Sequence, residues 1–415
     1  MKRLLAPLAA MAVLSGIGLA GIGLAGMGLA GMGRAQAATY DPGASDDEIR
    51  IGMTVPLSGP ASAYGIACAA TRAFFARTNQ DGGINGRKLT LLCEDDGFSP
   101  PRAIEQTRKL VESDKVLFLY NALGTSANTA VRPYLAARKV PQVLINSGAS
   151  KWLAPAENPW VTTGLPQNRT EAVIFARHIL ETMPDARVGL LQQADDYGKD
   201  YVEGLREGFG PEADRHIVAI ETFDLAYPTV DTQILNLKAR NVDVVIIAAL
   251  AKHAAQAIRK IGDLQWHPTV YLGWASTSID YVLKPAGLDH AKGVISTAIA
   301  KHPDDPRWKD DAGVARYLDF MKTWFPSGEV TSLSNVLAYA TTEVLVEILR
   351  RAGDDLTRAN IRDIARNIDV QPEMYIDGVR YTVTPQDLDP IKTFQMIRFD
   401  GLQWQSFGAP ISSSK

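Results

Sequence analysis

Residues 49–60 read Ile49-Arg-Ile-Gly-Met-Thr-Val-Pro-Leu-Ser-Gly-Pro60, and the fold prediction is built outward from them. The first seven residues form a short, mainly apolar run that predicts a β-strand, and the Pro-Leu-Ser-Gly-Pro that follows predicts a loop. Residues 64–78 then place apolar side chains on one side of a helix, and 89–93 is a second apolar run. This order predicts two parallel strands joined by a helix.

The same alternation continues along the chain. Further strands are expected at 116–120, 142–145, 188–191, 242–249 and 269–273, with helices near 101–111, 128–138, 169–182, 198–209, 229–239 and 251–262. Continuous apolar strands alternating with helices indicate parallel sheets that are covered on both faces. Because a second series begins after Thr162-Thr-Gly164, we expect two α/β lobes.

The C-terminal third has a different pattern. After the apolar residues 293–297 come two long helical stretches near 310–325 and 332–352. Residues 381–404 predict a β-hairpin with a turn at Asp400-Gly401. A chain that adds these elements to two sheets is expected to cross between the lobes more than once.

Residues 1–37 differ in composition from the rest of the chain. They contain no acidic residue; Lys2 and Arg3 precede an apolar stretch, and Ala35-Gln-Ala37 fits a signal-peptidase site. We predict an export signal that is cleaved near Ala37. A retained membrane anchor is the alternative, because about 20 apolar residues can span a bilayer. The glycine-rich repeat at 16–30 favours cleavage, because it would make a poor helix.

Length and charge limit the function classes. The 415 residues allow two or three domains. The chain carries 43 Lys and Arg against 46 Asp and Glu, a net charge of −3, and loss of 1–37 would leave −6. Such a chain has no basic field for nucleic acid. In an exported protein, Cys68 and Cys93 could form a disulfide or remain two small buried hydrophobic residues.

The sequence lacks the common catalytic and cofactor motifs. It has no His-x-x-x-His, Cys-x-x-Cys, Gly-x-x-x-x-Gly-Lys or Gly-x-Ser-x-Gly pattern. A Gly-x-Gly-x-x-Gly match at 16–21 is not preceded by a strand and carries no function. The acidic pairs Asp95-Asp96 and Asp195-Asp196 are expected to cap helices or stay solvated. We therefore expect no enzyme activity, no metal and no cofactor.

Two turns after predicted strands favour anion binding. Asn121-Ala-Leu-Gly-Thr-Ser126 leads directly into a helix, and Asn146-Ser-Gly-Ala-Ser150 follows the next strand. Ligands of open α/β sheets bind at the carboxyl ends of the strands. Helix N-termini with hydroxyl side chains can hold a carboxylate without Lys or Arg, although ordinary helix caps share this composition.

The opening stretch also carries a family resemblance. Together with Ala63-Tyr-Gly65, Asp81-Gly-Gly-Ile-Asn-Gly-Arg-Lys88 and Glu94-Asp-Asp96, it resembles periplasmic binding proteins of the leucine/isoleucine/valine family. Asp196-Tyr-Gly198 extends the resemblance over the mature chain. It implies a type I periplasmic-binding-protein fold: two doubly wound parallel-sheet lobes joined by three hinge crossovers, which close on a ligand. The implied divisions are 1–37 for the signal peptide, 48–164 with 299–373 for lobe 1, and 165–298 with 374–411 for lobe 2.

The resemblance also implies site residues. It places the family's carboxylate-binding serine at Ser126 beside Thr125, its backbone and hydroxyl pair at Gly148 and Ser150, and its cleft tyrosines at Tyr64 and Tyr197. The residues that hold the ligand's α-ammonium in amino-acid binders are replaced here by Leu250 and Ala275, with Trp274 alongside. The alternatives are a shifted alignment or a charge supplied by Glu221, Asp224 or Asp280.

These features predict a receptor. We expect a monomeric extracytoplasmic subunit of an ABC importer that captures a hydrophobic or aromatic carboxylate and delivers it to a permease with ATPase subunits. A buried ammonium without a carboxylate partner would cost several kcal/mol. The alternatives are a branched-chain or other amino-acid binding protein of the same importer class and a ligand-sensing receptor subunit.

Overall fold

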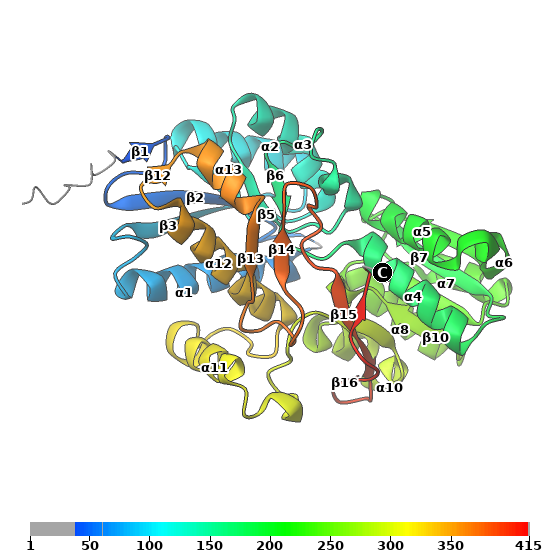
Figure 1. The fold of residues 1–415 in the computed structure, drawn as a ribbon. Helices are drawn as coiled ribbons and strands as arrows, with labels where there is room; N and C mark the ends of the chain where they lie inside the picture. Colours follow the sequence, from blue (N-terminus) through cyan, green and yellow to red (C-terminus); the bar gives the residue numbers. More distant parts are fainter. Residues whose placement is uncertain (1–37, 60, 414–415) are drawn as a thin grey trace, which may run out of the picture. The chain divides into compact units, whose positions relative to one another are not determined.

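Two main β-sheets organise the chain (Figure 1). The computed structural model describes residues 38–59 and 61–413, so the predicted signal peptide at 1–37 lies outside the described residues. Within the described residues no helix is both long enough and apolar enough to cross a membrane. The α/β fold class predicted from the alternating pattern is confirmed.

The first sheet has five parallel strands in the order β3-β2-β4-β5-β6. The strands are β2 (Glu48–Val55), β3 (Lys88–Asp95), β4 (Phe118–Tyr120), β5 (Gln142–Ile145) and β6 (Val161–Thr163). Its helices are α1 (Ile66–Gln80), α2 (Pro100–Arg108), α3 (Thr125–Ala137), α11 (Ala312–Trp324), α12 (Leu333–Ala352) and α13 (Arg358–Ala365). We call these elements lobe 1. Ile51 and Met53 of β2 are fully buried, as an apolar central strand requires.

The second sheet has eight strands in the order β16-β15-β11-β10-β9-β7-β8, with β17 beside β15. The strands are β7 (Val188–Gln193), β8 (Ile217–Phe223), β9 (Val244–Ala248), β10 (Thr269–Leu272), β11 (Ile295–Ala298), β15 (Thr393–Phe399), β16 (Trp404–Ser406) and β17 (Ile411–Ser412). Its helices are α4 (Asn168–Thr182), α5 (Asp196–Phe209), α6 (Ala213–His216), α7 (Asp231–Ala239), α8 (Ala251–Asp263), α9 (Lys284–Ala286) and α10 (Leu288–Ala291). We call these elements lobe 2.

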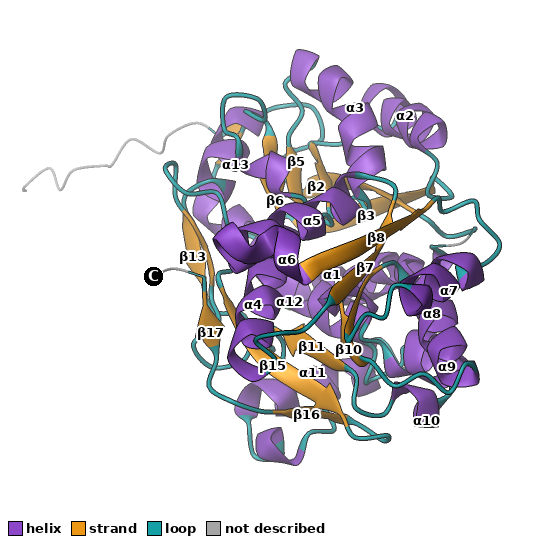
Figure 2. Cartoon of the chain, turned by 90° about the vertical axis from the view of Figure 1, so that its right-hand side faces the viewer, coloured by secondary structure: helices purple, strands orange, loops and turns teal. Residues whose placement is uncertain are grey.

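Helices cover both faces of the lobe 2 sheet. Figure 2 shows α4 and α5 on one side and α7 and α8 on the other. The neighbouring residues Leu190 and Leu191 of β7 accordingly pack into two different apolar clusters. Both faces of the strand are buried, which explains why its residues 188–191 form a continuous apolar run.

The described chain passes between the two sheets three times: after β6, after β11 and before β15. The last passage follows a separate pair of strands, β13 (Ile368–Val370) and β14 (Tyr381–Val383). The predicted boundary between 373 and 374 falls in the loop between these paired strands. Another short pair joins β1 (Thr39–Tyr40) to β12 (Asp355–Leu356). The detailed lobe boundaries stay a prediction.

Three details refine the sequence prediction. The predicted hairpin is formed by β15 and β16 and turns at Asp400, but Tyr381 lies outside it, in β14, where it pairs with Val370 of β13. The strands β6 and β8 were not predicted. Cys68 and Cys93 form a disulfide between α1 and β3, with their Cα atoms 6.4 Å apart. This bond decides between the two alternatives left open for the cysteines.

Candidate functional site: an interlobe cleft

A cleft lies where the carboxyl ends of both sheets meet. The loops after β4 and β5, together with side chains of α12, form its lobe 1 side. The loops after β7, β9 and β10 form its lobe 2 side. The cleft encloses about 880 Å³, including space that is open to solvent. Its position is the one at which open α/β sheets bind ligands.

The N-terminus of α3 forms one end of the cleft. Gly124 precedes the helix with φ +99°, and no side chain caps the first turn. A Cβ at Gly124 would lie 2.6 Å from the ring of Phe98, so this turn requires glycine. The first backbone N–H groups of α3 and the positive end of its dipole therefore remain available for an anion.

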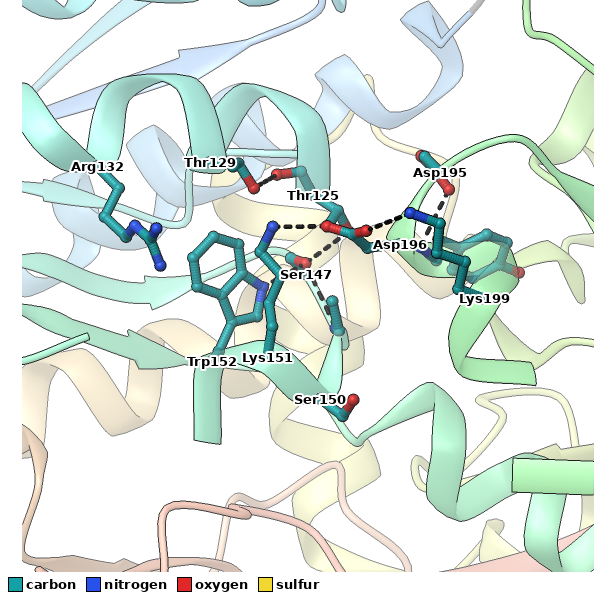
Figure 3. Close-up of polar contacts among 12 residues, drawn as sticks. Thr125, Thr129, Arg132, Ser147, Ser150, Lys151, Trp152, Asp195, Asp196 and Lys199 are labelled. Carbon is teal, nitrogen blue, oxygen red and sulfur yellow. Dashed lines mark hydrogen bonds and ion pairs between the residues drawn. The ribbon is translucent and has the colours of Figure 1, made fainter. Parts of the chain in front are cut away.

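Two hydroxyl groups lie beside this helix end (Figure 3). Thr125 Oγ1 and Ser147 Oγ are 2.8 Å apart, and both residues line the cleft. The indole N–H of Trp152 donates to Ser147 Oγ at 2.8 Å. This bond positions the Ser147 hydroxyl, and because one hydroxyl of the Thr125–Ser147 pair donates to the other, one of their two protons remains free for another acceptor.

The structure brings seven of the nine predicted site residues to the cleft. They are Tyr64, Thr125, Gly148, Tyr197, Leu250, Trp274 and Ala275. Ser126 is the second residue of α3 and is not among the lining residues. Ser150 does not line the cleft either, because its hydroxyl donates to Asp200 Oδ1 at 2.6 Å and its N–H to Oδ2 at 2.8 Å. The part each residue plays in ligand binding stays a prediction.

Contacts between the lobes hold the cleft closed. The Tyr64 hydroxyl, from lobe 1, donates to the Ala275 carbonyl oxygen at 3.1 Å and accepts from the Ala251 N–H at 3.2 Å. Lys151 of lobe 1 pairs with Asp196 of lobe 2 at 2.6 Å (Figure 3). The Lys151 ammonium is the main cause of the lowered pKa of Asp196. Burial raises the pKa of Asp200, which holds Ser150, to about 6.

The lobe 2 wall is mainly apolar. Leu250 precedes α8, while Trp274 and Ala275 follow β10. The indole Nε1 of Trp274 is buried and has no hydrogen-bond partner in the protein. The Tyr197 hydroxyl, on the same side of the cleft, is likewise buried without a partner among the described residues.

Glu171 supports this wall from behind. Its carboxyl group accepts hydrogen bonds from the hydroxyls of Tyr201 and Thr297, both at 2.5 Å, and from the Trp274 N–H at 3.0 Å. Burial raises the pKa of Glu171 to about 8, so it carries a proton at neutral pH, and in that form it donates to one of the two hydroxyls instead of accepting from it. Glu171 thus joins α4, α5, β10 and β11 without placing a negative charge at the cleft.

Asp195 is the one carboxylate among the described lining residues. It caps α5, accepting from the N–H groups of Tyr197 and Gly198 at 3.0 and 3.3 Å. Gln193 Nε2 donates to its other oxygen at 2.7 Å. Burial is the main cause of its raised pKa. None of the alternative acids lines the cleft: Glu221 binds Asn236, Asp224 binds Ala226 and Asp280 pairs with Lys284.

Four of the residues described above, at or behind the cleft, were missed in the sequence. Ser147 lies inside the second predicted turn, but it was not distinguished from its neighbours there. Asp195 was interpreted as a cap, which it is, although it also lines the cleft. Gln193 ends an apolar strand, and Glu171 lies within an amphipathic helix. Neither of these two positions carries a sequence signal, because their roles depend on how distant elements pack.

Comparison with known proteins identifies the family. The family model described as "Periplasmic binding protein" matches residues 48–399. A Leu/Ile/Val-binding protein of Rhizobium johnstonii is 25% identical over 312 residues, which are 74% of this chain and 80% of that protein. The family consists of solute-binding receptors, not enzymes.

Solved structures share the fold. A branched-chain amino acid ABC transporter protein from Thermus thermophilus, with bound valine, has a TM-score of 0.78 and 16% identity, covering 89% of this chain and 98% of that one. A solute binding protein from Rhodopseudomonas palustris, in complex with 3,4-dihydroxy benzoic acid, has a TM-score of 0.76 and 17% identity, covering 89% and 99%. At such identities the similarity concerns the fold alone.

Proposed function

The chain belongs to the periplasmic binding protein family, and on that premise we propose that it is the exported receptor of an ABC importer for a small carboxylate with a hydrophobic or aromatic body. The ligand is enclosed between the lobes and delivered to a membrane permease with ATPase subunits. The receptor acts as a monomer, and its export depends on the segment 1–37. The supporting observation is that the lobe 1 side of the cleft presents hydroxyl and backbone N–H donors, whereas the lobe 2 side is mainly apolar.

The lobe 1 side suits the carboxylate. The hydroxyls of Thr125 and Ser147 and the first N–H groups of α3 lie at one end of the cleft. Ser126 contributes its backbone N–H here rather than its hydroxyl. The backbone at Gly148 packs closely against the Pro166 carbonyl oxygen, and a Cβ at this position would lie only 2.3 Å from that oxygen. Hydrogen bonds from such donors to a charged acceptor each contribute about 1.5–3 kcal/mol.

The lobe 2 side suits an uncharged body. Leu250 and Ala275 provide apolar contact area, and Trp274 adds a flat aromatic surface. The nearest carboxyl groups are already engaged, Glu171 by three hydrogen-bond partners and Asp195 by the N-terminus of α5. An ammonium buried here would lack a free anionic partner. The Rhodopseudomonas palustris neighbour binds an aromatic acid, which fits this proposal.

An amino-acid ligand is the second candidate. Its supporting observation is that Asp195 lines the cleft and could turn one oxygen toward an ammonium. The Thermus thermophilus neighbour and the curated relatives, named for valine and for Leu/Ile/Val, fit this alternative.

A thermal-shift panel tests the proposal. The mature protein is heated with benzoate, phenylacetate, hexanoate, leucine or valine. A ligand at 100 times its dissociation constant stabilises the folded state by about 2.7 kcal/mol. We expect at least one free acid to raise the melting temperature and the two amino acids to leave it unchanged. A shift with leucine or valine and none with the acids would establish the second candidate instead.

A further inference from the structure

Gln193 leaves one hydrogen-bond acceptor unused at the cleft. It is the last residue of β7, it lines the cleft, and it is 3% exposed. Its Nε2 donates to Asp195 Oδ2 at 2.7 Å, but its Oε1 is buried without a partner. Leaving a buried acceptor without a donor costs free energy. A ligand that supplies a donor to this oxygen would remove that cost.

The orientation of the Gln193 amide follows from its surroundings. Asp195 is held in place by the N–H groups of Tyr197 and Gly198 at the start of α5. If the amide turned over, its Oε1 would face a carboxylate oxygen, and two acceptors would oppose each other. The Nε2 therefore stays on Asp195, and Oε1 is left without a partner among the described residues.

The chemistry of the missing group follows from a second unpartnered atom. Trp274 Nε1 is a buried donor that also lines the cleft. Two further lining residues of lobe 2 carry buried atoms without a partner: the Tyr197 hydroxyl, which can donate or accept, and the donor Asn168 Nδ2. Among the described residues, lobe 2 thus combines the acceptor of Gln193 with unpartnered donors. A hydroxyl both donates and accepts hydrogen bonds, whereas an ammonium only donates and would leave the indole N–H unpaired. An amide oxygen alone also leaves the charge of a buried ammonium uncompensated.

We infer that Gln193 determines specificity for a hydroxyl group on the ligand: the bound carboxylate carries this hydroxyl on its apolar or aromatic body and donates it to Gln193 Oε1. This inference rests on the proposed function and narrows its substrate class to hydroxy-substituted acids. A site that hydrogen-bonds a ligand hydroxyl discriminates strongly against the analogue that lacks it.

Calorimetry with matched ligands tests the inference. The probes are benzoate, 3-hydroxybenzoate, 4-hydroxybenzoate and 4-fluorobenzoate, the last being close in size to the 4-hydroxy acid but without a donor. We expect wild-type protein to bind at least one hydroxy acid more tightly than benzoate by about fivefold or more. In Gln193→Met, the ratio of the two affinities should fall to about one. In both proteins, 4-fluorobenzoate should bind about as tightly as benzoate.

Gln192→Met is the matched control, because Gln192 is the neighbouring residue, binds Thr222 and does not line the cleft. It should keep the wild-type preference. Gln193→Leu serves as a second variant if Gln193→Met does not unfold cooperatively. Two results would overturn this inference while leaving the proposed function standing. The first is a preference for the hydroxy acid that persists in the Gln193 variants, and the second is wild-type protein that binds benzoate and the hydroxy acids equally. If no benzoate binds while leucine does, the proposed function fails, and this inference fails with it.

Discussion

At the scale of single residues, the anion-binding end of the cleft depends on hydroxyls that are held by their neighbours. Ser147 is positioned by Trp152, and Thr125 begins the helix that supplies the free N–H groups. No Lys or Arg lines the described cleft. We therefore expect the charge of a carboxylate ligand to be met by hydrogen bonds and by a helix dipole, and side-chain hydroxyls to determine much of the affinity.

Replacing Ser147 by alanine tests this arrangement. We expect Ser147→Ala to weaken carboxylate binding by roughly 1–3 kcal/mol, because a charged acceptor loses one donor. Ser126→Ala is the control, since the Ser126 hydroxyl does not line the cleft; its effect should stay below about 0.5 kcal/mol. Isothermal titration calorimetry measures both. The reverse order of effects would place the carboxylate at Ser126.

Glu171 gives a pH-dependent prediction. Its pKa is raised to about 8 in the folded protein, against an ordinary value of 4.5. Between these values the folded state holds a proton that the unfolded state has lost, so stability falls as pH rises, by at most about 1.4 kcal/mol per pH unit. The Glu171→Gln variant keeps the shape of the side chain but has no group that titrates at this position. Its stability relative to wild type should therefore increase from pH 5 to pH 8.

Denaturant unfolding at the two pH values measures this difference. The other titrating groups are common to both proteins and largely cancel. A difference that is the same at pH 5 and pH 8 would show that Glu171 does not hold its proton.

At this scale, the sequence predicted side chains that follow strands and missed those that depend on packing. Leu250, Trp274 and Ala275 follow strands that are recognisable in the sequence, and all three line the cleft. The partner of Ser150 could not be predicted, because Asp200 lies 50 positions away in the other lobe. Because its hydroxyl binds Asp200, the side chain of Ser150 does not line the cleft.

At the scale of elements, the prediction held where burial was complete. The largely buried strands β2, β7, β9 and β10 appear as mainly apolar runs and were located within a few residues. The edge strand β8 was missed although residues 217–220 form a short apolar run; only Phe223 at its end is fully buried. The strand β6 was missed because it has only three residues. The predicted helices are likewise present.

The disulfide between α1 and β3 gives a prediction for these elements. It spans a separation of 25 residues, and such a cross-link stabilises a fold by about 2–4 kcal/mol, mainly by restricting the unfolded chain. We expect the double variant Cys68→Ala with Cys93→Ala to lose this stability in denaturant unfolding while still binding the ligand. Equal stability of oxidised and reduced wild-type protein would contradict this expectation.

At the scale of the whole described chain, we expect ligand binding to be coupled to contacts between the lobes. Tyr64, Ser150 and Lys151 of lobe 1 all bond to groups of lobe 2. These contacts form only when the cleft is closed, so they favour the state that holds the ligand. The three crossings follow from the family resemblance; alternation of strands and helices alone would not have established their number.

Lys151 and Lys199 provide a matched pair for testing this coupling. Both bind Asp196, but Lys151 comes from lobe 1 and Lys199 lies three residues away in the same helix. We expect Lys151→Met to weaken ligand binding by about 0.5–1 kcal/mol, as for a partly exposed ion pair, and less so at high salt. Lys199→Met should have no measurable effect on affinity. Equal losses in both variants would show that the pair does not act between the lobes.

The most direct test of the central claim compares leucine with 4-methylpentanoate by calorimetry on the mature wild-type protein. The two ligands share the same carbon skeleton and carboxylate and differ only in the α-ammonium. Because lobe 2 lacks a free partner for that charge, the account predicts that 4-methylpentanoate binds at least about tenfold more tightly, or about 1.4 kcal/mol. Equal or tighter binding of leucine would contradict it and identify an amino-acid receptor.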